Sequence, residues 1–305
     1  MNILVATEKP FAAEAVKGIR HEADSAGHQL QLLEKYTDRA QLLQAVATAD
    51  ALIVRSDKIT PDVLDAAGQL KIVVRAGAGY DNIDTDYARQ KGIVVENTPG
   101  QNANAVAELV FGLLVYTVRG FYNGKSGSEL KGKKLGILAF GNVGRNVARI
   151  AQGFGMDITA YDAYCPKDQI EAAGVHAASS QEELFETCDI VSLHIPATPE
   201  TRQSIGRRLV SAMKPGAILI NTARKEVIHE DELIDLLKER TDLKFITDIK
   251  PDRDADFLQF EGRYFSTPKK MGAQTAEANT NAGIAAARQI NAFFKDGCTK
   301  FQVNK

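Results

Sequence analysis

A glycine-rich segment between two short apolar runs offers the first candidate chemistry in this sequence. Residues 135–140 have the length and composition of a buried strand, residues 141–144 (Gly-Asn-Val-Gly) follow as a turn, and residues 146–153 have the spacing of an amphipathic helix. A second apolar run, 156–161, ends at Asp162. The start of a helix presents unpaired N–H groups and a partial positive charge, which together bind phosphate. The segment therefore predicts a βαβ unit that holds a dinucleotide.

Three residues of this unit have separate chemical roles. Gly141 allows backbone N–H groups to approach a pyrophosphate closely, and Gly144 allows the helix to pack tightly on the strand. Asp162 can accept hydrogen bonds from both ribose hydroxyls, and its charge would repel a 2′-phosphate, so the site is expected to prefer NAD over NADP. One position departs from the usual fingerprint, because Ala139 stands where the first glycine is expected.

Basic residues form a second group, earlier in the chain. Arg55 and Lys58 follow one short apolar run, Arg75 ends another, and a turn with exposed amides at Gly77 comes directly after it. Parallel strands direct their carboxyl ends to one edge of a sheet, where ligands bind. Arginine can bind a carboxylate or a phosphate with two parallel hydrogen bonds. These residues predict an anion site.

Apolar runs and helical segments alternate along the whole chain, which predicts an α/β fold with parallel sheets. Strands are expected at 2–7, 30–33, 51–54, 72–75, 91–95, 135–140, 156–161, 190–195, 217–221 and 245–249. Helices are expected at 11–23, 38–47, from Thr60 as N-cap and Pro61 onward, and at 103–119, 146–153, 181–186, 207–213, 231–239 and 276–295. Helix 103–119 is apolar on more than one face, so it either meets a partner subunit or lies buried between domains.

Composition limits the functional classes. The 305 residues carry a formal net charge of −2 and are 44% hydrophobic, so broad attraction to nucleic acid or a membrane surface is not expected. The three cysteines, at 165, 188 and 298, lack C-x-x-C spacing, which predicts neither disulfides nor a metal site. Without a signal-peptide pattern or a membrane-spanning run, the expected location is the cytoplasm.

Longer stretches resemble a known family, the D-isomer-specific 2-hydroxyacid dehydrogenases. They are VRSDKITPDVLDAA, VVRAGAGYDNIDTDYARQKGIVVENTPG, NAVAEL, ELKGKKLGILAFGNVGR, VSLHIPATPETR and MKPGAILINTAR, spread from about Val54 onward over most of the chain. The resemblance implies two Rossmann-like, doubly wound parallel-sheet domains with a cleft between them. It implies a discontinuous substrate-binding domain, 1–98 and 282–305, and an NAD-binding domain, 99–281, through which the family dimerises.

The resemblance also implies site residues. Arg224 matches the catalytic arginine in its NTAR context, and the amides of Gly77 and Ala78 match the carboxylate cradle. The substrate-binding set is Arg55, Ser56, Lys58, Arg75, Gly77, Ala78 and Asn102. The cofactor-binding set is Phe140, Gly141, Asn142, Val143, Gly144, Tyr161, Asp162, His194, Ile195, Pro196, Thr222, Ala223, Asp248 and Gly272.

The family's catalytic histidine and its supporting glutamate are both absent. Counting back from Gly272, Lys270 occupies the place of the histidine, whereas counting forward from Thr267-Pro268 points to Lys269. The glutamate position, five residues after the aspartate at 248, is Arg253. A buried lysine beside Arg224 would have a lowered pKa and could exchange the same proton. Lysine at this place, without a C-terminal regulatory domain, resembles a short class of phosphoglycerate dehydrogenases.

The expected activity is therefore the NAD-dependent oxidation of 3-phospho-D-glycerate to 3-phosphohydroxypyruvate, the entry to serine synthesis, with a lysine acid/base. A small phosphorylated hydroxy or keto acid and a second copy of the chain are the expected partners. Two alternatives stay open: a hydroxypyruvate or glyoxylate reductase, and a non-catalytic NAD-sensing protein on the same fold. Dimer versus tetramer and allosteric regulation also stay open.

Overall fold

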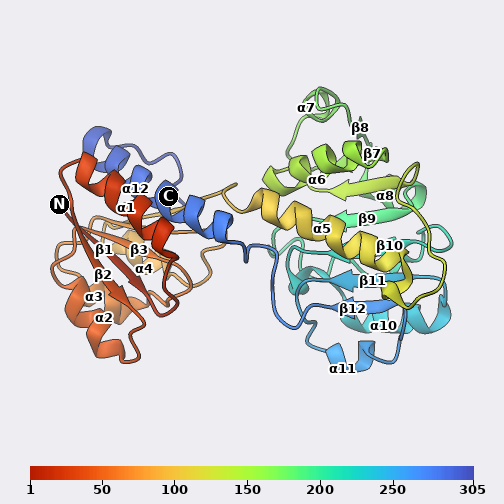
Figure 1. Ribbon diagram of the computed structural model, residues 1–305, viewed down its shortest axis with the longest axis horizontal. Coiled ribbons are helices and arrows are strands. Elements are labelled where there is room, and N and C mark those ends of the chain that lie inside the picture. Colours follow the sequence, from red (N-terminus) through yellow and green to blue (C-terminus); the bar gives the residue numbers. More distant parts are fainter. The chain divides into compact units, whose positions relative to one another are not determined.

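The computed structural model describes all 305 residues and divides into two compact units. Unit 1 comprises Met1–Asn102 and Gln274–Lys305, and unit 2 comprises Ala103–Ala273 (Figure 1). The predicted domain boundaries, after residues 98 and 281, differ from the edges of these units, which fall after Asn102 and after Ala273. The second predicted boundary falls inside the continuous helix Ala276–Asp296, and the compact units separate just before that helix begins.

Unit 1 is a five-stranded sheet covered by helices on both faces. Its strand order is β2-β1-β3-β4-β5, and all neighbouring strands pair in parallel. Its elements are β1 (Asn2–Thr7), α1 (Ala13–Ser25), β2 (Gln29–Glu34), α2 (Arg39–Val46), β3 (Ala51–Val54), α3 (Pro61–Ala66), β4 (Ile72–Arg75), α4 (Thr85–Gln90), β5 (Val94–Asn97) and α12 (Ala276–Asp296). In β1, Leu4 and Ala6 join one buried cluster and Ile3 and Val5 join the other, as expected from alternating strand side chains.

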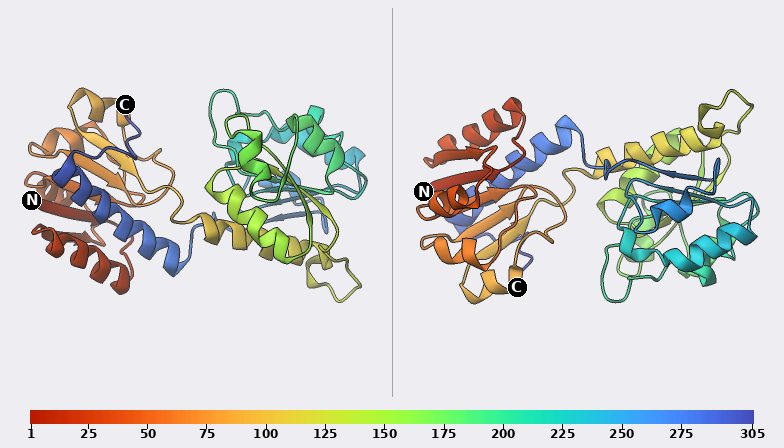
Figure 2. Two further views of the ribbon diagram at one scale, coloured as in Figure 1. Left: turned by 90° about the horizontal axis from the view of Figure 1, so that it is seen from above. Right: turned by 90° about the horizontal axis from the view of Figure 1, so that it is seen from below.

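The last helix completes the core of unit 1, although it follows unit 2 in the sequence. Views from above and below both show α12 beside α1 (Figure 2). Small residues allow this close packing, since a Cβ on Gly18 would lie 2.5 Å from Ile284 Cδ1 and one on Gly283 would lie 2.9 Å from Ile19 Cδ1. The buried face of α12, which includes Ala286 and Ile290, packs with strand residues of the first sheet.

Unit 2 is a seven-stranded parallel sheet of order β12-β11-β10-β9-β6-β7-β8. Its elements are α5 (Ala103–Val118), η1 (Gly120–Tyr122), β6 (Lys134–Leu138), α6 (Asn142–Gly153), β7 (Asp157–Tyr161), α7 (Lys167–Glu171), β8 (His176–Ala177), α8 (Gln181–Thr187), β9 (Ile190–Leu193), α9 (Arg207–Val210), β10 (Ile218–Asn221), η2 (Lys225–Val227), α10 (Glu230–Glu239), β11 (Lys244–Thr247), α11 (Asp254–Phe257) and β12 (Tyr264–Ser266). The first strand, β6, pairs with β7 on one side and β9 on the other, so the strand order reverses there. Doubly wound sheets bind ligands at such a reversal.

The two parallel sheets confirm the predicted α/β class of two doubly wound domains. Several local predictions were wrong. The helix predicted from residue 146 begins at Asn142, so residues 142–144 are its first turn and not a separate loop. The strand predicted at 91–95 runs from Val94 to Asn97, because Gly92 has a left-handed φ of 70° in the turn that follows α4. Thr60 precedes α3 as predicted, but its side chain makes no capping hydrogen bond.

No helix is long and apolar enough to cross a membrane. Seven short elements, α4, η1, α7, β8, η2, α11 and β12, are absent from the predictions. Each has six or fewer residues, too few to show a hydrophobic period.

Candidate active site

The carboxyl edge of the seven-stranded sheet brings together most of the residues singled out in the second half of the chain. Because the strands are parallel, the segments that follow them meet at this one edge. These segments are 139–144 after β6, Tyr161 and Asp162 at the end of β7, His194 to Pro196 after β9, Thr222 to Arg224 after β10, Asp248 after β11, and Lys270 to Gly272 beyond β12.

The glycine-rich turn leaves open space at the start of a helix. Gly141 is the N-cap residue of α6, and a Cβ added to it would meet no atom within 4 Å. A Cβ on Gly144 would instead lie 2.3 Å from the carbonyl oxygen of Ala139. Helix packing thus requires Gly144, whereas the space over Gly141 is free for a ligand group. Unpaired N–H groups at the N-terminus of this twelve-residue helix suit a pyrophosphate, so these residues fit NAD.

Ala139 occupies a backbone conformation that favours glycine. Its φ is +80°, in the left-handed region that costs an L-residue about 1–2 kcal/mol. The unusual alanine of the fingerprint is therefore accommodated at the expense of local strain, and the turn keeps the shape that a glycine would give it.

Asp162 is held by the backbone more firmly than the sequence suggested. Its Oδ2 accepts a hydrogen bond from the Phe140 N–H at 2.7 Å, and its Oδ1 accepts from the N–H groups of Tyr164 at 2.7 Å and Cys165 at 2.9 Å. A carboxylate has about four lone-pair positions, so about one remains for a ribose hydroxyl instead of the two predicted. The negative charge that disfavours a 2′-phosphate is kept at this place.

His194 follows β9 with a neutral ring. Its Nε2 lies 2.9 Å from Ser192 Oγ, and its backbone N–H donates to the Leu138 carbonyl at 2.9 Å. Burial lowers the pKa of His194 to about 3, so the imidazole is uncharged at neutral pH. Contact with the cofactor stays a prediction for this residue, and its neutral ring offers no proton exchange near neutrality.

Lys270 and Arg224 meet at one carbonyl oxygen. Lys270 Nζ donates to the Ala223 oxygen at 2.6 Å, and Arg224 Nη1 donates to the same oxygen at 3.1 Å. Burial is the largest effect on the pKa of Lys270 and lowers it. The positive charge of Arg224 lowers it further, while Asp248 and Glu226 raise it. A lysine with a lowered pKa beside an arginine is suited to accept a proton from an alcohol.

Asp248 fixes the segment that carries this lysine. The residue is fully buried, and its Oδ2 accepts from the Gly272 N–H at 2.8 Å. Its Oδ1 makes no hydrogen bond and lies 3.8 Å from Lys270 Nζ. Burial raises the pKa of Asp248, while the charge of Lys270 opposes this rise. A Cβ on Gly272 would lie 2.8 Å from Oδ2, so this glycine is required by the same contact.

The geometry separates the two candidate lysines. Lys269 is exposed, and its carbonyl accepts from Thr267 Oγ1 at 2.7 Å, whereas the Lys270 side chain turns inward toward Ala223. Arg253, at the expected glutamate position, pairs with Asp231 and Asp256 beside α10 and α11 and has no contact with Lys270.

Asn221 is a positioning residue that sequence reasoning missed. It is buried, its Oδ1 accepts from the Ala223 N–H at 2.9 Å, and its Nδ2 donates to the Arg224 carbonyl at 2.9 Å. These two bonds hold the Thr222–Arg224 segment in its bend. The signal was present in the sequence, since an asparagine at the end of an apolar strand must satisfy its amide locally.

Arg55, predicted to bind an anion, is engaged by protein groups in unit 1. Its Nη1 donates to the carbonyls of Lys9 and Pro10 at 2.9 and 3.0 Å, and its Nη2 donates to Asn279 Oδ1 at 2.7 Å. The guanidinium also lies 5.2 Å from the centre of the Phe11 ring. The arginine thus joins the loop after β1 to the start of α12.

The other predicted anion-binding groups lie at the ends of β3 and β4. Arg75 Nε donates to the Arg55 carbonyl at 3.0 Å, and the Arg75 guanidinium covers Gly77, which has a φ of +150° and where any Cβ would clash. The side chains of Ser56 and Lys58 are exposed, Ala78 is half-buried, and so is Asn102 at the end of this part of unit 1.

Two further residues of this edge were missed from the sequence. Asp57 is buried and accepts hydrogen bonds from Tyr36 Oη at 2.8 Å and from the Glu8 N–H at 2.7 Å, so it organises the loop that carries Ser56 and Lys58. Asn97 Nδ2 donates to the Ala78 carbonyl at 2.6 Å and supports the Gly77-Ala78 turn. No group of three or more histidine, cysteine or acidic side chains forms a metal-binding cluster.

Known proteins resemble this chain in both sequence and structure. Residues 116–262 match the profile of the family described as D-isomer specific 2-hydroxyacid dehydrogenase, NAD binding domain. The chain is 38% identical over 283 residues to a D-3-phosphoglycerate dehydrogenase of Methanocaldococcus jannaschii, covering 87% of this chain and 54% of that protein. It is 36% identical over 282 residues to a hydroxypyruvate reductase of Thermotoga maritima, covering 86% and 90%.

Among solved structures, the chain is similar to the NAD+-bound 3-phosphoglycerate dehydrogenase of Entamoeba histolytica. The TM-score is 0.90 at 48% sequence identity, and the match covers 100% of this chain and 99% of that one. The chain spans about half the length of the curated phosphoglycerate dehydrogenase from M. jannaschii. The chain belongs to the D-isomer-specific 2-hydroxyacid dehydrogenase family, and its cofactor is NAD.

Proposed function

We propose that the protein oxidises 3-phospho-D-glycerate to 3-phosphohydroxypyruvate, with Lys270 as the acid/base. The observation that carries the proposal is the convergence of Lys270 Nζ and Arg224 Nη1 on the Ala223 carbonyl, at the edge that fits NAD. The similarity to proteins named 3-phosphoglycerate dehydrogenase, at 48% and 38% identity, supports the substrate.

The proposed chemistry divides between two side chains. Bound NAD would supply the acceptor for the hydride that leaves C2. Lys270 in its neutral form would accept the proton of the C2 hydroxyl, and its lowered pKa makes that form accessible. Arg224 would stabilise negative charge on the same oxygen. Asp248 would keep Lys270 in place through its bond to the Gly272 N–H and its proximity to Nζ.

The phosphate group of the proposed substrate would bind at the basic carboxyl edge of the sheet in unit 1. Lys58 is exposed after β3, and Arg75 covers the Gly77 turn after β4. A phosphorylated substrate has two anionic ends, so it needs more cationic and amide groups than hydroxypyruvate does. The terminal nitrogens of Arg55 already donate to protein acceptors. Arg55 would therefore attract the phosphate through its positive charge, without a direct hydrogen bond, and would hold the loop after β1 in place.

The test compares reduction of 3-phosphohydroxypyruvate and hydroxypyruvate, each with NADH and NADPH. We expect the phosphate to raise kcat/KM about 100-fold, as two charge-assisted hydrogen bonds would, and we expect NADH to be preferred because of Asp162. Lys58→Ala should lower kcat/KM for the phosphorylated substrate and leave that for hydroxypyruvate unchanged. Lys269→Ala, which removes an equal charge at another exposed position, serves as the control.

A hydroxypyruvate or glyoxylate reductase is the second candidate, and one observation favours it. Both terminal nitrogens of Arg55 are already bonded to protein acceptors, which leaves fewer donors for a phosphate. The relative from T. maritima, named hydroxypyruvate reductase, also matches the chain over 90% of its length. Equal kcat/KM for the two keto acids would decide for this second function.

We also propose that two copies associate through unit 2. Most of the apolar side chains of α5 are buried within the unit, but Leu109, Val115 and Tyr116 are partly exposed, and Tyr122 beyond the helix is 66% exposed. Partly exposed apolar side chains of this kind suit a partner surface. Light scattering should give twice the chain mass of 33.1 kDa, and a mass of one chain at micromolar concentration would contradict the proposal.

A further inference from the structure

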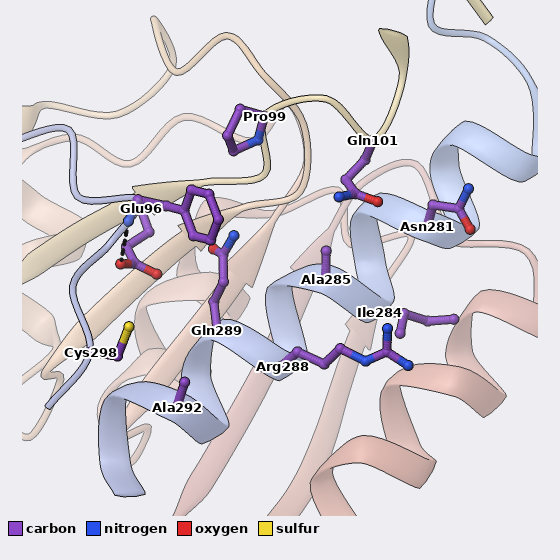
Figure 3. Close-up of a pocket in the computed structure, with 11 residues that line it drawn as sticks. Glu96, Pro99, Gln101, Asn281, Ile284, Ala285, Arg288, Gln289, Ala292 and Cys298 are labelled. Carbon is purple, nitrogen blue, oxygen red and sulfur yellow. Dashed lines mark hydrogen bonds between the residues drawn. The ribbon is translucent and has the colours of Figure 1, made fainter. Parts of the chain in front are cut away.

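A cavity of about 460 Å³ lies within unit 1, and its lining contains none of the residues proposed above for catalysis, substrate binding or cofactor binding. It opens between α12, the end of β5 and the last residues of the chain (Figure 3). Its lining includes Glu96, Gln101, Gln289, Cys298 and Phe301. Small-molecule sites have volumes of about 300–1,000 Å³, so this cavity is large enough for one.

The wall formed by the C-terminal residues is firmly attached. Val303 N–H donates to the Val95 carbonyl at 2.9 Å, and the Val95 N–H donates to Asn304 Oδ1 at 2.9 Å. Asn304 Nδ2 also donates to the Ile93 carbonyl at 2.8 Å. These bonds hold the segment against β5, so Phe301 has a defined place beside the cavity.

Two buried acceptors on the cavity wall are incompletely satisfied. Glu96 is 1% exposed, and its carboxylate accepts one hydrogen bond, from the Phe301 N–H to Oε1 at 3.2 Å. No basic side chain forms an ion pair with it, and burial raises the pKa of Glu96. Gln289, on α12, is 9% exposed, and its Oε1 has no hydrogen-bond partner.

Arg288, the basic side chain on the cavity wall, does not neutralise the Glu96 carboxylate. Arg288 Nε lies 2.8 Å from Glu22 Oε1 on α1, and its side chain extends away from Glu96 (Figure 3). A buried acceptor left unpaired costs about 1–3 kcal/mol, and a carboxylate costs more. Glu96 and Gln289 Oε1 therefore lack a cationic partner, because Arg288 is paired with Glu22 and the amides of Gln101 and Asn281 that also line the cavity are neutral. A cationic ligand would supply that partner.

We propose that this cavity binds a small primary amine as its ammonium ion. The N–H groups would donate to the Glu96 carboxylate and to Gln289 Oε1. Pro99, Ala285 and Ala292, which also line the cavity, would contact a short apolar chain on the amine. The proposal is independent of the dehydrogenase reaction.

The experiment titrates the full chain with n-butylammonium chloride by calorimetry, at constant ionic strength and about pH 8, where the amine is still charged. Butan-1-ol and sodium butyrate are the neutral and anionic comparators. We expect saturable binding of the ammonium ion that is at least about tenfold tighter than that of either comparator, as one charge-assisted hydrogen bond would give.

Variants then locate the site. Glu96→Gln keeps the shape and the acceptor for the Phe301 N–H but removes the charge, and it should weaken ammonium binding at least about tenfold. Gln289→Leu should also weaken binding, and it serves if Glu96→Gln unfolds. The control is Glu14→Gln, which removes an equal charge from an exposed carboxylate that pairs with Lys17, and which should leave binding unchanged.

Three results would overturn the proposal. The first is the absence of saturable ammonium binding up to about 10 mM, the weakest affinity that the titration would measure. The second is butan-1-ol binding as tightly as the ammonium ion. The third is an unchanged ammonium affinity in folded Glu96→Gln and Gln289→Leu. Thermal unfolding of each variant shows whether it is folded.

Discussion

Replacing Lys270 with alanine is expected to lower kcat for 3-phosphoglycerate oxidation about 10²- to 10⁴-fold, the usual contribution of a positioned acid/base. The reason is that Lys270 is the titratable side chain that shares the Ala223 carbonyl with Arg224 and has a lowered pKa. NAD affinity, measured by calorimetry, should change little, because the glycine turn and Asp162 are untouched. Steady-state rates of the wild type and the variant provide the measurement.

Two matched variants separate proton transfer from charge. Lys269→Ala removes the neighbouring, exposed lysine and should retain full turnover. Lys270→Arg keeps a positive charge, but a guanidinium does not release its proton in this pH range, so it should be nearly as slow as Lys270→Ala. Full activity of Lys270→Arg would mean that the residue acts only through its charge.

The pH profile gives an independent check of the same assignment. Oxidation needs the neutral amine, so its rate should rise as the pH increases through the pKa of Lys270. Because burial and Arg224 lower that pKa, the midpoint should lie below the ordinary value of 10.5. The charge of Asp248 raises the pKa of Lys270, so Asp248→Asn should move the midpoint to lower pH. A midpoint that does not move would argue against electrostatic contact between these side chains.

Replacing Gly141 with alanine should weaken NAD binding without destabilising the fold. A Cβ there meets no protein atom within 4 Å, and the φ of −78° is one that alanine adopts freely. The added methyl group would instead occupy the space proposed for the pyrophosphate. Crowding of this kind costs about 1–3 kcal/mol, or about 5- to 150-fold in affinity. Calorimetric titration with NAD and thermal unfolding measure the two effects.

Gly144→Ala provides the contrast, because its Cβ would lie 2.3 Å from the Ala139 carbonyl oxygen. That oxygen belongs to the backbone and cannot move alone, so we expect about 1–3 kcal/mol of lost stability. If Gly141→Ala lost as much stability as Gly144→Ala, both glycines would serve only packing.

Ala139→Gly should instead increase the stability of the fold. It relieves the strain of a φ of +80°, and this gain is partly offset by the greater unfolded-state entropy of glycine, which leaves up to about 1 kcal/mol.

The sequence alone predicted the features that depend on local order along the chain. Apolar period and turn residues located the long helices and most of the strands. The spacing of Gly141, Gly144 and Asp162 predicted the edge of the sheet at which we propose that NAD binds. Parallel pairing followed from the alternation of strands and helices, because such connections return each strand in the same direction. Seven elements of six or fewer residues were not predicted, because they are too short to show a hydrophobic period. A four-residue strand such as β3 was predicted, since it is a continuous apolar run.

Tertiary structure decided everything that depends on which groups meet across large separations in sequence. Counting residues favoured Lys270 as the acid/base but left Lys269 open, and only the inward turn of Lys270 onto Ala223, 47 positions away, distinguishes them. The same holds for Asp248, whose carboxylate holds the lysine segment, and for Arg55, whose donors are taken by Lys9, Pro10 and Asn279. A side chain's charge and hydrogen-bonding capacity can be read from its type, but its partners, burial and pKa arise only when distant segments pack together.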